Sequence, residues 1–165
     1  MWGMNIPISK FKRIRAYVDT SVFGGLNDDE FAEASVRFFE NVRNGRFTLL
    51  ISQMLLDELQ PSPELVKRDF ESLPQNYLER VEVTDEVVDL AQSYLATGVL
   101  PEYAKGDALH VAMATIARAD VIISWNFKHI VNFQRIQKFN SVNLAHGYGL
   151  MDIRSPLEVE YGGDD

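Results

Sequence analysis

The chain has 165 residues, 46% hydrophobic and 24% charged, which is the composition of a single globular domain with a core large enough to fold alone. Its formal net charge of −8 argues against a protein that coats nucleic acid regardless of sequence, because such a protein needs a basic face. The absence of cysteine excludes disulfides, thiolate zinc sites and cysteine nucleophiles.

The two ends of the chain differ in composition from its middle. Residues 1–13 are expected to form a loose leader and residues 161–165 an acidic tail, on either side of one domain at 14–160. The leader is basic but lacks the long apolar segment of a signal peptide, and no apolar stretch is long enough to cross a membrane. We therefore expect a cytoplasmic protein with no membrane partner.

Apolar runs alternate with segments of helical periodicity along the whole domain. The runs predict strands at 14–18, 46–51, 80–83, 121–124 and 150–153. One helix is predicted from a cap at 27–29 to a stop at 44–45, and others at 52–59, 62–72, 84–98, 106–119 and 134–146. A turn is predicted at the glycine-rich 24–25, and a turn or short helix at 126–132. This alternation indicates an α/β sandwich with a central, mainly parallel sheet of about five strands flanked by helices.

Asp19 ends the first predicted strand and is followed at once by Thr20 and Ser21. In open α/β sheets, the carboxyl ends of the strands form the edge where ligands bind. Aspartate is a poor strand former and is rarely buried without a partner. Taken alone, this residue fits either a ligand-binding group or an ordinary cap.

Three further oxygen-bearing side chains are predicted to return to the same edge. Glu58 lies in the helix after the second strand, Asp107 opens a helix, and Asn126 follows the fourth strand. Each also has a structural explanation, as a helix former, a helix-dipole partner or a turn residue. Carboxylates that converge without a cation raise one another's pKa, and a divalent cation removes that repulsion. An all-oxygen ligand set suits Mg²⁺ or Mn²⁺ rather than zinc or copper.

Several motifs in this order resemble one known family. They are Tyr17-Val18-Asp19-Thr20-Ser21-Val22, Glu58, and the segments GDALHVA at 106–112 and ADVIISWN at 119–126. With weaker matches at 142–143, 147–148 and 153–156, they resemble PIN-domain nucleases, and among these the VapC-type toxins of bacterial toxin–antitoxin pairs and related orphan PIN proteins. The resemblance implies a PIN-like three-layer fold and an endoribonuclease that depends on Mg²⁺ or Mn²⁺.

The resemblance also implies a role for each acidic position. Asp19, Glu58 and Asp107 match the family's catalytic, metal-binding acids, and Asn126 falls at a fourth catalytic position where many members carry aspartate. Asp19 and Asp107 are expected to hold the metal directly. Glu58 is expected to hold a second ion or to position the attacking water. The asparagine lowers the negative charge of the predicted site. We therefore expect one tightly bound metal ion, with a second ion arriving with the substrate.

Other polar residues near these motifs are candidates for contact with the substrate. Thr20, Ser21, Ser124 and Lys128 are assigned this role, with a turn held together by hydroxyls as the alternative for the first two. His110 is interpreted as packed and hydrogen-bonded within the fold. The other histidines, His129 and His146, have no evident partner in the sequence.

The expected partners are an RNA substrate, a second copy of the chain in a homodimer, and a small antitoxin protein that binds a groove. Two other functions remain open. A phosphotransferase with Asp19 as nucleophile would need a second aspartate where Ser21 stands. A catalytically silent PIN module that binds RNA or a protein would account for Asn126.

Overall fold

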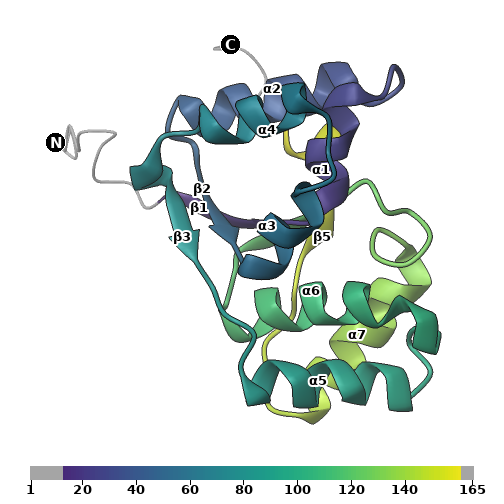
Figure 1. Cartoon of the computed structure of the whole chain (residues 1–165). Helices are drawn as coiled ribbons and strands as arrows, with labels where there is room; N and C mark the ends of the chain where they lie inside the picture. The colour runs from purple at the N-terminus through teal and green to yellow at the C-terminus, as the bar shows by residue number, and fades with distance from the viewer. Residues whose placement is uncertain (1–12, 161–165) are drawn as a thin grey trace, which may run out of the picture.

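The computed structural model describes residues 13–160, so most of the predicted leader and the whole predicted tail lie outside the described residues. Five parallel strands form one sheet in the order β3-β2-β1-β4-β5 (Figure 1). The strands are β1 (Ile14–Val18), β2 (Phe47–Ile51), β3 (Leu78–Arg80), β4 (Val121–Ile123) and β5 (Ile153–Arg154). The predicted α/β fold with a parallel central sheet is confirmed.

Helices cover both faces of the sheet and complete three layers (Figure 1). One face carries α1 (Thr20–Gly24), α2 (Ala32–Arg43), α3 (Gln53–Leu59) and α4 (Glu64–Glu71). The other carries α5 (Asp85–Ala96), α6 (Lys105–Ile116) and α7 (Phe133–Ala145). Short 3-10 helices lie at Gly25–Asn27, Gln75–Tyr77, Glu102–Ala104 and Pro156–Val159. Within the described range, no helix is both long and apolar enough to span a membrane.

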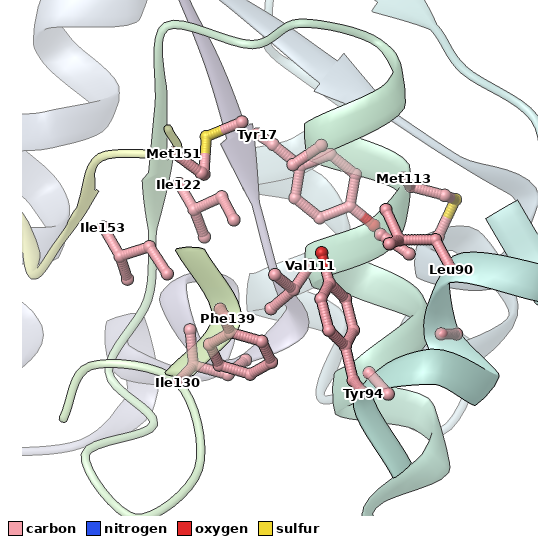
Figure 2. Close-up of a cluster of buried hydrophobic side chains, with 14 of the residues drawn as sticks. Tyr17, Leu90, Tyr94, Val111, Met113, Ile122, Ile130, Phe139, Met151 and Ile153 are labelled. Atoms are coloured by element: carbon pink, nitrogen blue, oxygen red, sulfur yellow. The ribbon is translucent and has the colours of Figure 1, made fainter. Parts of the chain in front are cut away.

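The strands are apolar on both sides because each face of the sheet packs against a separate core. Tyr17, Leu50 and Ile122 point toward α5, α6 and α7, where they join the core drawn in Figure 2. Their strand neighbours point the other way, toward α1 to α4. The continuous apolar runs of the sequence therefore reflect a sheet buried on both faces, as parallel sheets are.

The segment after β1 differs from the expected glycine-rich turn. Thr20–Gly24 is helical, and the backbone of Gly25 is also helical with φ −58°. Val22 and Phe23 are fully buried by this short helix, and Phe23 packs against Phe39. Burial of these two side chains outweighs the low helix propensity of glycine.

The edge strands also differ from their predicted positions. β3 begins two residues before the predicted 80–83, and β5 begins only at the last residue of the predicted 150–153 and ends one residue beyond it. Each edge strand forms only where its inner neighbour offers backbone partners, as in the pairing of Ile122 with Ile153. That constraint is not visible in local composition.

The strand order places a topological switch point between β1 and β4. From β1 the chain runs through β2 and β3 on one side, and β4 and β5 lie on the other side of β1. In open α/β sheets, ligands bind in the crevice at the carboxyl ends of the strands at such a point. Asp19 and Ser124 directly follow the two strands that meet there.

Gly25 and Gly24 provide a matched test of the packing beside this switch point. A Cβ atom at Gly25 would lie 2.5 Å from Ser35 Oγ and 2.7 Å from Trp125 Nε1, whereas a Cβ at Gly24 would meet nothing within 4 Å. We expect Gly25→Ala to lower the free energy of unfolding by about 1–3 kcal/mol, because overpacking displaces the buried Trp125 indole. Gly24→Ala should be neutral or slightly stabilising. Urea denaturation measures both, and equal effects would contradict the steric explanation.

Candidate functional site

Asp19 lies at the end of β1 and is only 4% exposed. Ser21 Oγ donates to its Oδ1 at 2.5 Å, and Ser124 Oγ donates to its Oδ2 at 2.9 Å. The residue occupies the N-cap position of α1, but its side chain accepts no capping hydrogen bond from that helix. An ordinary cap is therefore not the role of this carboxylate.

The charge of Asp19 is only partly compensated by its surroundings. Burial raises the pKa of Asp19, the hydrogen bonds from Ser21 and Ser124 lower it, and the negative charge of Asp107 raises it further. Within residues 13–160, no ion pair joins any of the three predicted metal-binding acids to lysine or arginine. A buried carboxylate with hydroxyl donors and an acidic neighbour favours a bound cation.

Glu58 approaches the site from α3 and is half-buried. Its carboxylate accepts a hydrogen bond from Thr20 Oγ1, and both of its oxygens lie 3.2 Å from His110 Nε2. Burial acts to raise the pKa of Glu58, but the hydrogen bonds from His110 and Thr20 outweigh it, so the pKa is lowered. Glu58 is therefore a stable carboxylate at neutral pH, directed toward His110.

Asp107 lies in the first turn of α6, and its Oδ2 is 2.9 Å from Nδ1 of His129. His129 is buried, and its Nε2 is 3.5 Å from Tyr103 Oη. The interpretation of His129 as a residue without a partner is wrong. The segment at 126–132 is the predicted turn rather than a helix, and it brings this histidine from beyond β4 to the acidic edge.

Asn126 holds that turn together. Its Oδ1 accepts from the backbone N–H of His129 at 2.9 Å, and its own N–H donates to Ser124 Oγ at 2.9 Å. The same serine hydroxyl donates to Asp19. Asn126 is therefore linked to Asp19 through Ser124 and to Asp107 through His129, and within residues 13–160 no hydrogen bond joins its side chain directly to an acid.

The candidate substrate-binding hydroxyls point into the site rather than toward solvent. Thr20 bonds Glu58, Ser124 bonds Asp19, and Ser21 Oγ bonds Asp19 while accepting from the backbone N–H of Trp125 at 2.8 Å. These hydroxyls therefore orient the carboxylates. Lys128 is exposed, and its Nζ lies 5.8 Å from the centre of the Tyr103 ring.

The donor chemistry of the site fits a hard divalent cation, although the side chains do not converge on one point. In the described part of the chain, no group of three acidic or histidine side chains is placed to hold a metal ion. Glu58 is turned toward His110, and Asp107 is hydrogen-bonded to His129. Asp19 and Asp107 nevertheless interact electrostatically, and one or two carboxylates with several waters satisfy Mg²⁺.

A second group of acids lines a hollow of about 580 Å³ bordered by Ile14 and Phe47, away from this edge. There Arg154 pairs with Asp152 at 2.7 Å and with Glu158 at 3.2 Å. These acids are exposed and have a cationic partner, so they do not favour a bound metal ion. The carboxyl edge remains the better candidate site.

Comparison with known proteins gives a family and a set of similar folds. The sequence model of the family described as PIN domain matches residues 16–129. A search of curated proteins found no match.

Three solved structures share the fold. VapBC2 from Rickettsia felis, bound to a DNA fragment from its promoter, has a TM-score of 0.55 and 16% identity over 86% of this chain and 98% of its own. A toxin–antitoxin complex from Klebsiella pneumoniae has a TM-score of 0.51 and 15% identity over 69% and 88%. VapC20 from Mycobacterium tuberculosis, a sarcin-ricin loop cleaving toxin, has a TM-score of 0.54 and 16% identity over 69% and 92%. At these identities the similarity is one of fold.

The burial of Asp19 predicts that Asp19→Asn stabilises the metal-free protein at neutral pH. A raised pKa in the folded state means that ionisation of Asp19 favours unfolding as pH rises through that pKa. Asparagine removes the charge and keeps one acceptor and one donor for the two serines. We expect a gain of about 1 kcal/mol or more at pH 7 in EDTA, which disappears in acid where Asp19 is protonated.

Chemical denaturation at the two pH values measures this gain. Asp57→Asn is the control, because Asp57 is an exposed carboxylate on α3 and its replacement should change stability by less than about 0.5 kcal/mol. A loss of stability in Asp19→Asn at neutral pH would contradict the explanation.

Proposed function

This chain belongs to the PIN-domain family, and on that premise we propose that it is a divalent-metal-dependent endoribonuclease that hydrolyses RNA phosphodiester bonds. The observation that carries the proposal is the buried Asp19 carboxylate at the switch point, with two serine donors and the charge of Asp107 beside it. Similarity in fold to a sarcin-ricin loop cleaving toxin supports it.

Asp19 and Asp107 would hold a Mg²⁺ or Mn²⁺ ion between them. When bound, the ion would lower the pKa of a coordinated water and neutralise charge that develops on the phosphate. Ser21 and Ser124 orient the two oxygens of Asp19, so that the carboxylate keeps one direction with or without substrate. His129 orients Asp107 in the same way through one oxygen.

Glu58 would orient the attacking water, because its hydrogen bonds from His110 and Thr20 keep it ionised and hold its carboxylate in one direction. Asn126 would act on the site through Ser124 and the loop that carries His129. The amide adds no negative charge at this position. One tightly held ion is therefore proposed, with a second arriving with the substrate.

Exposed aromatic rings near the acids favour single-stranded RNA as the substrate. In residues 13–160, the aromatic side chains that are exposed are Tyr103 at 73%, Phe127 at 46% and Phe133 at 75%. Tyr103 contacts His129, which is hydrogen-bonded to Asp107, and Phe127 directly follows Asn126. Unpaired bases stack on such rings, and Lys128 beside Tyr103 supplies a cation for phosphate.

The structural neighbours bear on one expected partner of this chain. The structural neighbours include VapBC2 and another toxin–antitoxin complex, which supports a small antitoxin as a partner of this chain. We further propose a homodimer that acts in the cytoplasm.

A catalytically silent PIN module is the second candidate function. It is favoured by the absence, within residues 13–160, of three acidic or histidine side chains arranged around a metal position, and by the amide at Asn126. A phosphotransferase is disfavoured, because Ser21 stands where a second aspartate would be needed, and its hydroxyl donates to Asp19 instead. Metal binding and cleavage separate the nuclease from the silent module.

Purified protein should cleave a mixed single-stranded RNA with Mg²⁺ or Mn²⁺ and not with EDTA. Asp19→Asn and Asp107→Asn should each reduce the rate at least about 100-fold, because each removes a charged ligand. Asp57→Asn, on the exposed side of α3, should cleave at the wild-type rate. Cleavage that survives Asp19→Asn would refute the assignment, and folded wild-type protein that binds metal without cleaving would favour the silent module.

Tyr103→Ala should weaken binding of single-stranded RNA by about tenfold and raise KM with little change in kcat, because stacking acts on substrate binding. Tyr103→Phe keeps the ring and loses only the long contact from Oη to His129, so it should retain wild-type KM. Steady-state kinetics on an unpaired oligonucleotide measure both variants. Equal defects would assign the effect to the hydroxyl rather than to stacking.

A further inference from the structure

A chain of hydrogen bonds runs through the protein interior and ends at Glu58. Tyr17 Oη lies 2.5 Å from Nδ1 of His110, and Nε2 of His110 faces both carboxylate oxygens of Glu58. These hydrogen bonds therefore join β1, α6 and α3.

The inner members of this chain are almost completely shielded from water. Tyr17 is 0% and His110 3% exposed. In the described part of the chain, no buried side-chain nitrogen or oxygen lacks a partner. A buried polar network is stable only when all of its members have hydrogen-bond partners. Each hydrogen-bonding hydrogen in this network therefore points to a defined acceptor.

The direction follows from counting donors. The Glu58 carboxylate can only accept, so Nε2 of His110 carries the ring hydrogen and donates it to Glu58. Nδ1 is then an acceptor, and the Tyr17 hydroxyl at 2.5 Å donates to it. The opposite tautomer would place a nitrogen lone pair against the carboxylate.

We propose that Tyr17 and His110 are positioning residues for Glu58, and that they fix the direction of its carboxylate by presenting it with the Nε2–H tautomer of the imidazole. Thr20 donates to Glu58 as well, so two donors from different elements hold one carboxylate. Tyr17 lies in the same core as Tyr94 (Figure 2), but only the network that contains Tyr17 leads to the acidic edge. The role of Glu58 in catalysis rests on the proposed function, whereas the direction of the network does not.

The tautomer of His110 tests the network without any assay of activity. The chain has three histidines, and His110→Gln identifies the signals of this one in ¹⁵N-labelled protein. Two-bond ¹H–¹⁵N NMR spectra of the wild type at neutral pH should show the neutral, Nε2-protonated form. In Tyr17→Phe the ring hydrogen should stay on Nε2, where Glu58 accepts it, and the ¹⁵N resonance of Nδ1 should move downfield because its lone pair loses a hydrogen-bond donor. An Nδ1-protonated ring in the wild type, or an Nδ1 resonance that Tyr17→Phe leaves unchanged, would overturn the proposal.

Kinetics test whether the network acts through Glu58. Tyr17→Phe should lower kcat about 10- to 100-fold with KM unchanged, as for the loss of an orienting hydrogen bond behind a catalytic group. In a Glu58→Gln background the same change should have little further effect, because its target is absent. Equal effects in both backgrounds would overturn the positioning role.

Tyr94→Phe is the matched control for stability. Tyr94 is also fully buried, and its hydroxyl bonds Asn143 and lies near Thr115. Its loss should destabilise the protein about as much as Tyr17→Phe and leave kcat unchanged.

If folded wild-type protein cleaves no RNA, the nuclease proposal fails, and the NMR result still decides whether the network presents Nε2–H to Glu58.

Discussion

The carboxylate of Asp19 is buried where β1 ends, and the elements around it supply the hydroxyl donors that keep it there. Ser21 can donate to Asp19 because α1 begins immediately after β1. Ser124 can donate to Asp19 because β4 is hydrogen-bonded beside β1 in the sheet. Hydroxyls stabilise a buried anion less than a charged donor does, so the pKa of Asp19 stays raised. The negative charge of the Asp19 carboxylate is therefore only partly compensated, and ionisable groups with shifted pKa values are common in functional sites.

Three carboxylates at one edge have three different environments. Asp19 has serine hydroxyls, Glu58 has a threonine and a histidine, and Asp107 has a histidine alone. The pKa of Asp19 is raised by burial, whereas that of Glu58 is lowered by its hydrogen bonds. When neighbouring acids are shifted in opposite directions, they are suited to different tasks. The assignment of Asp19 to cation binding and Glu58 to orientation of water follows this division.

The alternation of strands and helices was predictable because it depends on local apolar patterns, and the acids were found by residue type and family resemblance. The helix at Thr20–Gly24 was missed because its glycines indicate a turn unless burial of the side chains between them is known. The contacts of His129 with Asp107, 22 residues apart, and of Tyr17 with His110, 93 residues apart, were missed for a different reason. Pairings at such separations are fixed by strand order, and a single sequence contains no direct signal of them.

The edge strands of the sheet are short, with three residues in β3 and two in β5. An open sheet edge exposes unpaired backbone N–H and C=O groups that can recruit a strand from another chain. With so little edge backbone, this protein offers a poor template for intermolecular strand addition. Any assembly with a second copy or another protein must therefore be specified mainly by side chains on its helices and loops, and the same feature protects the molecule from edge-to-edge aggregation.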